Sequence, residues 1–421
     1  MTTFNFDLQL FASAPAAKLG TFGMGKESTF GTAVTPTVFH IPSTWGADIE
    51  NNLIDRPGAT GSIGEREKLT GLVMGAGSLM AELDPDTAGS IFLAVLGAEA
   101  IGANASNPGA APTVSTTLST AITVTGYQPA TPAAMTNITV GQRLIVDTAG
   151  NQETVYVDAV SSTQFWAKFT KAHASAVTIT QATQIAAQDH TFTLASPSLS
   201  FTAQVNDVVA AKNAFGCQAD SLSMKLQPKT VVEATMGFQY QSELTNGSPT
   251  AASFSTLRGL VFETPGNTVT LNGIALDSSI QGIDLQIQRN IQKDYPKMGN
   301  GRLRPQLPDM GVKVSGTLNL AYETQTALQM LWGNVGATGP QSKVVAAPLV
   351  LTIKGIDYVN TGVAYAIQIK IPMAKFAKAP IVRKVGDYLK QTVSFVASES
   401  ATGAGDDISV VVTNGSSAAS L

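Results

Sequence analysis

The chain has 421 residues, of which 44% are hydrophobic and only 13% are charged, and its 26 Lys and Arg residues nearly balance 30 Asp and Glu residues. Soluble domains usually contain about 25% charged residues, so most of this surface must be polar but uncharged. A single cysteine excludes a disulfide framework and a thiolate metal site, and three scattered histidines leave little for metal or base chemistry. The net charge of −4 argues against a nucleic-acid-binding surface, which requires clustered basic residues.

The first residues lack the features of a targeting segment. Residues 1–18 contain no basic region before their apolar run, and Asp7 interrupts that run. The longest apolar stretch, residues 88–98, is shorter than the roughly 18 to 20 residues that span a bilayer. We therefore expect a protein that is made in the cytoplasm and has no membrane segment.

Strands dominate the predicted secondary structure. Residues 311–320, 363–371 and 232–240 each alternate apolar and polar side chains with a period of two. This alternation is typical of half-buried strands in antiparallel sheets. We expect a mainly β fold.

Two helices are predicted. The first begins at Asp84-Pro85-Asp86, where an acid precedes a proline in the first turn, and it ends near Gly97. The second begins near Glu323 and ends at Gly333 or Gly336, because glycine favours helix C-termini.

The two helices belong to a repeat. When the chain is shifted by 239 residues, positions 73–98 align with 312–337 without a gap and seven of the 26 pairs are identical. Ordinary residue usage would give about two identities. The strand parity and the order of strand, acid and helix also match, so we interpret the chain as a duplicated unit.

A stretch of about 90 residues interrupts the first copy. It opens with a Pro-, Ala- and Thr-rich run and contains three further strand patterns, which indicates a small all-β module. We divide the chain into an N-terminal arm (1–17), a first unit (18–100 and 191–248), the inserted module (101–190), a second unit (249–400) and a C-terminal arm (401–421).

Candidate chemical sites are weak. Cys217 is expected to be a small core residue rather than a nucleophile, since no histidine is near it in sequence. His173 and His190 lack an acid spacing that indicates a metal site or a catalytic triad. We expect the acids of the inserted module, Asp147, Glu153 and Asp158, to lie on solvated strand faces. No catalytic, cofactor-binding or metal-binding residue is predicted.

Two charged loops are candidates for contacts between subunits. A plain solvated loop is the equally supported alternative for each. A second basic run near the C-terminus (Lys375, Lys378, Arg383, Lys384 and Lys390) lacks the interleaved aromatic residues that a nucleic-acid-binding surface would need. The candidate contact residues are Asp55, Arg56, Glu65, Arg66, Glu67 and Lys68 in the first loop, and Arg289, Lys293, Lys297, Arg302 and Arg304 in the second.

Several of these segments together resemble a known family. They are the strand containing Gly77-Ser78-Leu79, the acid-capped helix ending at Leu96-Gly97, and residues 216–224 leading into an alternating strand. This order resembles that of the tail tube proteins of long, flexible-tailed bacteriophages. The opening residues 5–12 are also similar to the start of many phage structural proteins.

The resemblance implies a fold and an assembly. The fold would be mainly β, with duplicated β-sandwich or barrel units, one flanking helix per unit and the small inserted module. Family members form rings whose inner sheets join, and the rings stack into a hollow tail that conducts DNA and the tape measure protein, with tail terminator and tail-tip proteins at its ends. The resemblance thus implies a virion component without enzymatic activity or cofactors.

The duplication departs from the usual single unit per chain. Three chains would supply six units, which predicts a trimeric ring with pseudo-sixfold symmetry; a hexamer of chains is the alternative. We expect the inserted module on the tube exterior and a neutral or acidic lumen, whose residues the sequence does not identify. A capsid or decoration protein and an adhesive β-sandwich protein are the alternative functions, and a carbohydrate-acting enzyme is disfavoured because acids and aromatics do not cluster.

Overall fold

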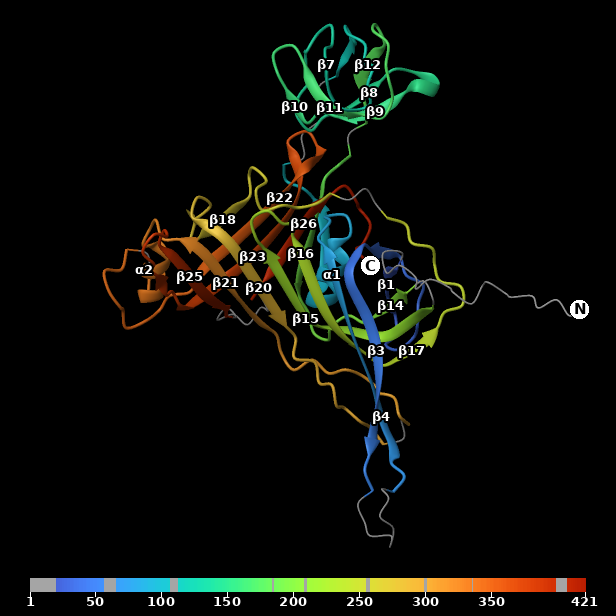
Figure 1. Cartoon of the computed structure of the whole chain (residues 1–421), viewed down its shortest axis with the longest axis vertical. Helices are drawn as coiled ribbons and strands as arrows, with labels where there is room; N and C mark the ends of the chain where they lie inside the picture. Colours follow the sequence, from blue (N-terminus) through green and yellow to red (C-terminus); the bar gives the residue numbers. More distant parts are fainter. Residues whose placement is uncertain are drawn as a thin grey trace, which may run out of the picture.

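The computed structural model describes residues 20–56, 66–106, 113–183, 185–207, 210–254, 258–298, 301–334, 336–398 and 407–421. These residues form a mainly β structure with two α-helices, as predicted. Figure 1 shows an elongated body of strands, a small module above it, and a ribbon of two strands that projects below it.

The body contains two copies of a similar strand set. The first copy comprises β1 (Thr21–Lys26), β2 (Val38–His40), β3 (Pro42–Ile54), β4 (Leu69–Glu82), α1 (Ala88–Leu96), β5 (Gly97–Ala103), β13 (Gln188–Leu194), β14 (Phe201–Asn206), β15 (Ala211–Leu226), β16 (Glu233–Tyr240) and β17 (Ser242–Thr245). The second comprises β18 (Thr268–Leu271), β19 (Ile274–Ala275), β20 (Ile280–Gln288), β21 (Lys313–Ala321), α2 (Thr326–Trp332), β22 (Ala347–Asn360), β23 (Val363–Lys378), β24 (Ile381–Val382), β25 (Lys390–Ala397) and β26 (Ser409–Asn414).

Strand pairing in the body supports the predicted duplication. β4 lies between β3 and β16, and β21 lies between β20 and β25. Gly77 of β4 pairs with Phe238, and the equivalent Gly316 of β21 pairs with Phe395. A Cβ atom would lie 2.3 Å from the Phe238 ring at Gly77 and 2.6 Å from the Phe395 ring at Gly316. Both copies therefore need glycine for the same close packing.

Two β-bulges recur at matching positions. The register between β15 and β16 shifts between Ala219 and Ser221, and that between β23 and β25 shifts between Phe376 and Lys378. A second shift separates residues 42 and 44 in β3, and its counterpart separates residues 280 and 282 in β20. Because a bulge bends its strand and increases the local twist, the two copies share their curvature as well as their strand order.

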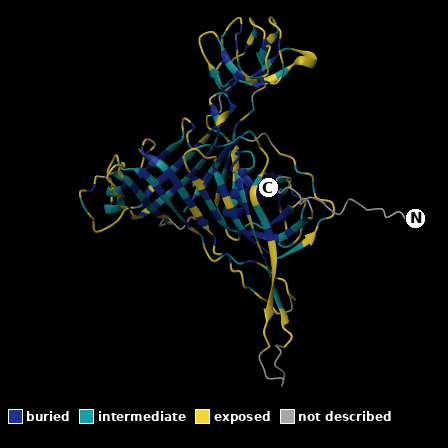
Figure 2. Ribbon diagram, viewed as in Figure 1, coloured by how far each residue is buried: buried dark blue, intermediate teal, exposed yellow. Residues whose placement is uncertain are grey.

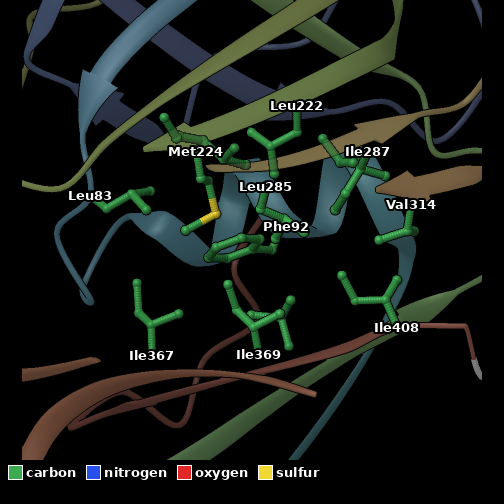
Figure 3. Close-up of a cluster of buried hydrophobic side chains, with 14 of the residues drawn as sticks. Leu83, Phe92, Leu222, Met224, Leu285, Ile287, Val314, Ile367, Ile369 and Ile408 are labelled. Atoms are coloured by element: carbon green, nitrogen blue, oxygen red, sulfur yellow. The ribbon is translucent and has the colours of Figure 1, made fainter. Parts of the chain in front are cut away.

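One sheet runs through both copies. Its order is β24 with the end of β23, then β25, β21, β20, the end of β15, β16, β4 and β3. We call it the shared sheet. One face of it packs on the main hydrophobic core, which includes residues from both copies. Figure 2 shows this buried core along the body, and Figure 3 shows Phe92 of α1 among side chains from β15, β20 and β23.

The predicted helices form with small shifts at their starts. The Asp84 carboxylate accepts a hydrogen bond from the Asp86 backbone N–H (2.9 Å), and its carbonyl accepts one from Ala88 (2.7 Å). Asp84 thus closes a turn ahead of α1, and the helix begins at Ala88. α1 ends at Gly97, whose φ of 100° is left-handed, and α2 ends at Gly333.

The inserted module has its own sheets and its own core. It contains β6 (Ser115–Thr117), β7 (Gly126–Ala130), β8 (Arg143–Val146), the short 3₁₀ helix η3 (Ala149–Asn151), β9 (Glu153–Tyr156), β10 (Ala159–Val160), β11 (Phe165–Phe169) and β12 (Thr178–Gln181). Its buried residues form a separate hydrophobic cluster. β5 and β13 pair from Gly97–Leu194 to Ala103–Gln188, so the module stands at the end of a two-stranded stalk (Figure 1).

The segment predicted as a C-terminal arm is part of the body. β26 pairs with β13 on one side and with β23 on the other. Ile408, Val410 and Val412 of this segment are buried in the main core. The prediction of an arm over 401–421 is therefore corrected for residues 408–414, whose alternating apolar side chains fill a gap in the sheet.

Candidate functional site

The two copies meet at one joint, which we call the internal joint. Residues 221–226 of β15 pair with residues 283–288 of β20 in an antiparallel register. On the core face, Leu222 lies opposite Ile287 and Met224 opposite Leu285, and all four are buried. The pairing turns two separate units into one continuous sheet.

The opposite face of the internal joint is polar. Lys225 lies directly opposite Asp284, and opposite charges on neighbouring strands attract each other. The same polar face continues along the whole shared sheet, because its side chains alternate with those of the core. It includes Gly46, Asp48, Glu50, Ser78, Glu82, Ser221, Ser223, Lys225, Glu233, Thr235, Asp284, Gln286, Gln288, Ser315, Thr317, Asn319, Thr392 and Ser394.

Acids gather at one end of this polar face. Glu82 of β4 lies opposite Glu233 of β16. Partial burial raises the pKa of Glu82, and the negative charges of Asp84 and Glu233 raise it further. A phosphate group would be repelled at this place for the same electrostatic reason.

The shared sheet ends in two strands without a second neighbour. Within the described residues, β3 pairs only with β4, and β24 pairs only with β25. β3 is the counterpart of β20. The end of β23 and β24 pair with β25 in the same register in which the end of β15 pairs with β16, so they are the counterpart of the end of β15. The free edges are therefore the counterparts of the two strands that meet in the internal joint. The repeat visible in the sequence covers only β4 and α1, so these edges could not be predicted from it.

Arg289 is buried inside the chain, with 1% of its surface exposed. Its guanidinium donates hydrogen bonds to the carbonyls of Val95 (2.7 Å) and Ala195 (2.6 Å) and pairs with the Asp309 carboxylate. Val95 lies in the last turn of α1, where a positive charge offsets the helix dipole. Arg289 therefore binds the second copy to the first, and its side chain is used inside the chain; the contact between rings stays a prediction for its loop.

Arg304 is also buried, with no surface exposed. It donates hydrogen bonds to the carbonyls of Lys293 (3.0 Å), Gly75 (3.1 Å) and Tyr240. It thereby fixes the loop between β20 and β21 onto strands of the first copy. Like that of Arg289, its side chain is used inside the chain, and the contact between rings stays a prediction for its loop.

Arg302 and the remaining basic residues of this loop are exposed. Arg302 donates a hydrogen bond to the carbonyl of Gly71 (3.1 Å) and another to Asn51, so it lies along the projecting β3–β4 ribbon. Lys293 pairs with Asp220 (3.3 Å), and Lys297 lies 5.2 Å from the centre of the Tyr295 ring.

The predicted contact residues of the first loop lie at the tip of the ribbon. Asp55 and Lys68 form an ion pair of 3.0 Å, and Arg56, Arg66 and Glu67 are exposed. Glu65 lies outside the described residues. The structure thus brings the charged ends of both loops to the same side of the body (Figure 1).

The inserted module contains a buried cluster around His173. Its imidazole nitrogens lie 2.6 Å from Glu153 Oε1 and 3.3 Å from Asp147 Oδ2. Hydrogen bonds from neighbouring groups hold the pKa of both carboxyls below their usual values. These two acids are therefore structural partners of His173. The sequence had instead indicated that they lie on a solvated strand face.

Two other groups singled out by the sequence are also built into the structure. His190 Nδ1 lies 2.7 Å from Glu99 Oε1, next to the C-terminal residues. Cys217 is a buried core residue, and burial raises the pKa of its thiol. In the described part of the chain, His, Cys, Asp and Glu form no group of three or more suited to a metal ion.

A cavity of about 440 Å³ separates the module from the second copy. Tyr127 and Asp158 line it on the module side, and Asp357, near the end of β22, lines it on the side of the second copy. Burial raises the pKa of Asp158 to about 6, and the charge of Asp357 contributes to this shift. The two acids therefore oppose the docking of the module at neutral pH.

The comparisons with known proteins agree with this architecture. Neither helix in the described residues is long and apolar enough to cross a membrane. No curated protein matches the sequence at a significant level. A family model described as "phage tail tube protein" matches residues 18–409, which is nearly the whole chain, and the chain therefore belongs to the phage tail tube protein family.

Proposed function

We propose that this protein polymerises into rings that stack head to tail and form the hollow tube of a phage tail. The tube conducts DNA and the tape measure protein, and tail terminator and tail-tip proteins close its two ends. The protein is made and assembled in the host cytoplasm, becomes part of the virion, and catalyses no reaction. The observation that carries this proposal is the internal joint, in which two tube units of one chain already form one sheet with two free, matching edges.

A ring of three chains follows from repeating that joint. The two tube units, residues 18–100 with 191–248 and residues 249–400, are joined inside each chain, and three such chains supply six units with pseudo-sixfold symmetry. Closing the edges also removes unpaired strands, which otherwise promote aggregation. Six chains in a ring remain the alternative.

The polar face of the shared sheet forms the wall of the lumen in this proposal. Ser, Thr and Gln side chains predominate there, and the Glu82–Glu233 end is acidic. Such a wall does not hold phosphate groups, so DNA can slide along it. Thr235, Gln286 and Gln288 of this face are exposed, whereas the side chains of the opposite face are buried in the main core.

Stacking of rings is assigned to the exposed charged residues of the two loops. These are Asp55, Arg56, Arg66, Glu67, Lys68, Lys293, Lys297 and Arg302, together with the projecting ribbon of β3 and β4. Contacts of this head-to-tail kind do not close on themselves and therefore produce filaments. The module lies away from the shared sheet and is assigned to the tube exterior.

Electron microscopy of the purified protein, combined with native mass spectrometry, tests the proposal. We expect stacked rings with an open lumen and three chains per ring. Six chains per ring would overturn the trimer and retain the tube. Closed shells would instead favour a capsid protein, and particles that stay monomeric would favour a decoration or adhesive protein.

A further inference from the structure

We infer that β3 of one chain pairs with residues 378–383 of a second copy, in the register that the internal joint has inside one chain. This inference rests on the proposed ring and specifies its interface. The interface would be an antiparallel extension of the shared sheet across the chain boundary. The second copy is the partner because its edge has the geometry that β15 offers to β20.

The register follows from two fixed offsets. The matching bulges and glycine–phenylalanine pairs show which residues of the two copies are equivalent. Each residue of β3 is equivalent to the residue of β20 that lies 238 positions later, and each residue at the end of β15 is equivalent to the residue of β23 or β24 that lies 157 positions later. In the internal joint, Gln288 lies opposite Ser221 and Leu285 opposite Met224. Shifting both strands puts Glu50 opposite Lys378, Ile49 opposite Ala379, Asp48 opposite Pro380, Ala47 opposite Ile381, Gly46 opposite Val382 and Trp45 opposite Arg383.

The charges of the two edges are complementary in this register. Glu50 and Lys378 are exposed, and within the described residues neither forms an ion pair in the single chain. Asp48 would lie diagonal to Lys378; in the single chain its carboxylate is 3.8 Å from Lys212 and remains 99% exposed. Each joint would thus contain one acid opposite a lysine, but at different positions, because Asp284 and Lys225 of the internal joint correspond to Gly46 and Val382. The basic run 375–390 thus gains acidic neighbours on the lumen face.

The apolar side chains also meet on the core face. Ile49 is 37% exposed at the edge of β3 although its face of the sheet is the core face. The register brings it against Ala379 and next to Ile381, as Ile287 lies against Leu222 inside the chain. Pairing would therefore bury an apolar group that the single chain leaves in water.

The backbone of the second edge is able to pair. Thr392 N–H donates to the Pro380 carbonyl (3.3 Å), so Pro380 faces β25 and its missing N–H does not affect the outer edge. Ala379 and Ile381, which flank it, therefore face outward. The Ala379 carbonyl accepts a hydrogen bond of 3.3 Å from the Gln391 side chain and keeps a second lone pair for a neighbouring strand.

Charge reversal gives the first test. Glu50→Lys or Lys378→Glu alone places like charges opposite each other, and we expect either variant to raise the concentration needed for ring assembly about tenfold. The double variant Glu50→Lys/Lys378→Glu should restore assembly to nearly the wild-type level. Because both side chains are exposed, circular dichroism and thermal melting should show folded chains in all three variants. Failure of the double variant to recover would contradict the register.

Disulfide cross-linking gives the second test. Opposite residues on antiparallel strands have Cα atoms about 4.5 to 5.5 Å apart, which suits a disulfide. Oxidised rings of Glu50→Cys/Lys378→Cys should run as covalently linked chains on a denaturing gel, and those of the displaced control Glu50→Cys/Val382→Cys should not. The native Cys217 is buried and does not interfere.

The outcomes separate this inference from the proposed function. If wild-type protein forms rings but the Glu50–Lys378 pair does not cross-link, or links no better than the control, the register is wrong and the tube remains. If the wild-type protein forms no rings under any condition in which it is folded, both the proposed ring and the proposed register are wrong.

Discussion

The two helices show how the copies differ. All nine residues of α1 are buried, since β13, β15, β5 and β26 pack around it, whereas only Ala327 and Met330 of α2 are buried. In Figure 1, α1 lies in the middle of the body and α2 at its far end. α1 is thus enclosed by its own chain, whereas α2 is only partly buried. Each copy leaves one sheet edge free, at β3 in the first and at β24 in the second. The partial burial of α2 is expected of a helix whose further neighbour belongs to another chain.

The largest expected effect comes from breaking the contact that encloses the first copy. Arg289→Met keeps the volume of the side chain but leaves Asp309 and two carbonyls without their partner. We expect a loss of about 3 to 5 kcal/mol in the free energy of unfolding, measured by denaturant titration. Arg302→Met is the matched control, because Arg302 is exposed, and it should cost less than about 1 kcal/mol. Equal losses in the two variants would contradict the role of Arg289.

A matched pair of helix substitutions sharpens the comparison of the copies. Phe92 of α1 and Leu331 of α2 are equivalent by the 239-residue offset, but Phe92 is fully buried and Leu331 is only partly buried. Phe92→Ala should destabilise the single chain by about 3 to 5 kcal/mol. Leu331→Ala should cost about 1 kcal/mol, since less apolar area returns to water. Thermal unfolding of the unassembled chains measures both, and similar losses would show that α2 is as enclosed as α1.

The module is inserted in the first copy but lies next to the second, and the stability of the contact between the module and the second copy should depend on pH. The pKa of Asp158 is raised from 3.8 to about 6, so the folded state binds a proton more tightly than the unfolded state. Stability at this contact should therefore be greatest below about pH 4 and decrease as the pH rises to about 6. Hydrogen exchange of residues 355–358 at pH 5 and pH 7.5 measures the effect. Asp158→Asn should remove the pH dependence, and its persistence would assign it to another group.

Removing the module should make the copies more alike and change assembly least. Residues 104–187 can be replaced by Asn-Gly, a turn that suits the two-stranded stalk of β5 and β13. We expect rings with the same number of chains and the same lumen, and a thinner exterior in electron micrographs. A folded deletion variant that no longer polymerises would place the module in the ring interface.

Much of the fold could be predicted from the sequence. The strands over 311–320 and 363–371 alternate strictly, and glycine marks the ends of both helices, so local patterns were sufficient there. The gapless match over 73–98 and 312–337 revealed the duplication, which the paired bulges and glycines now support.

The buried arginines and the His173 cluster could not be predicted. Arg289 and Arg304 stand in a Gly- and Pro-rich loop that looks solvated, and their partners lie near positions 95, 195, 75 and 240. His173 and Glu153 likewise come together from separate segments of the module. Such contacts depend on tertiary pairing that no local pattern specifies, and the same holds for the place of β26 beside β13.

The internal joint also has a consequence for the thermodynamics of assembly. A contact within one chain forms at any protein concentration, whereas each contact between chains requires two molecules to give up independent translation and rotation, at a cost of roughly 4 to 15 kcal/mol. In a ring of three duplicated chains, half of the six joints are already closed when the chain folds. Assembly therefore needs three molecules to meet instead of six, and the ring should persist at dilutions at which separate single units would dissociate.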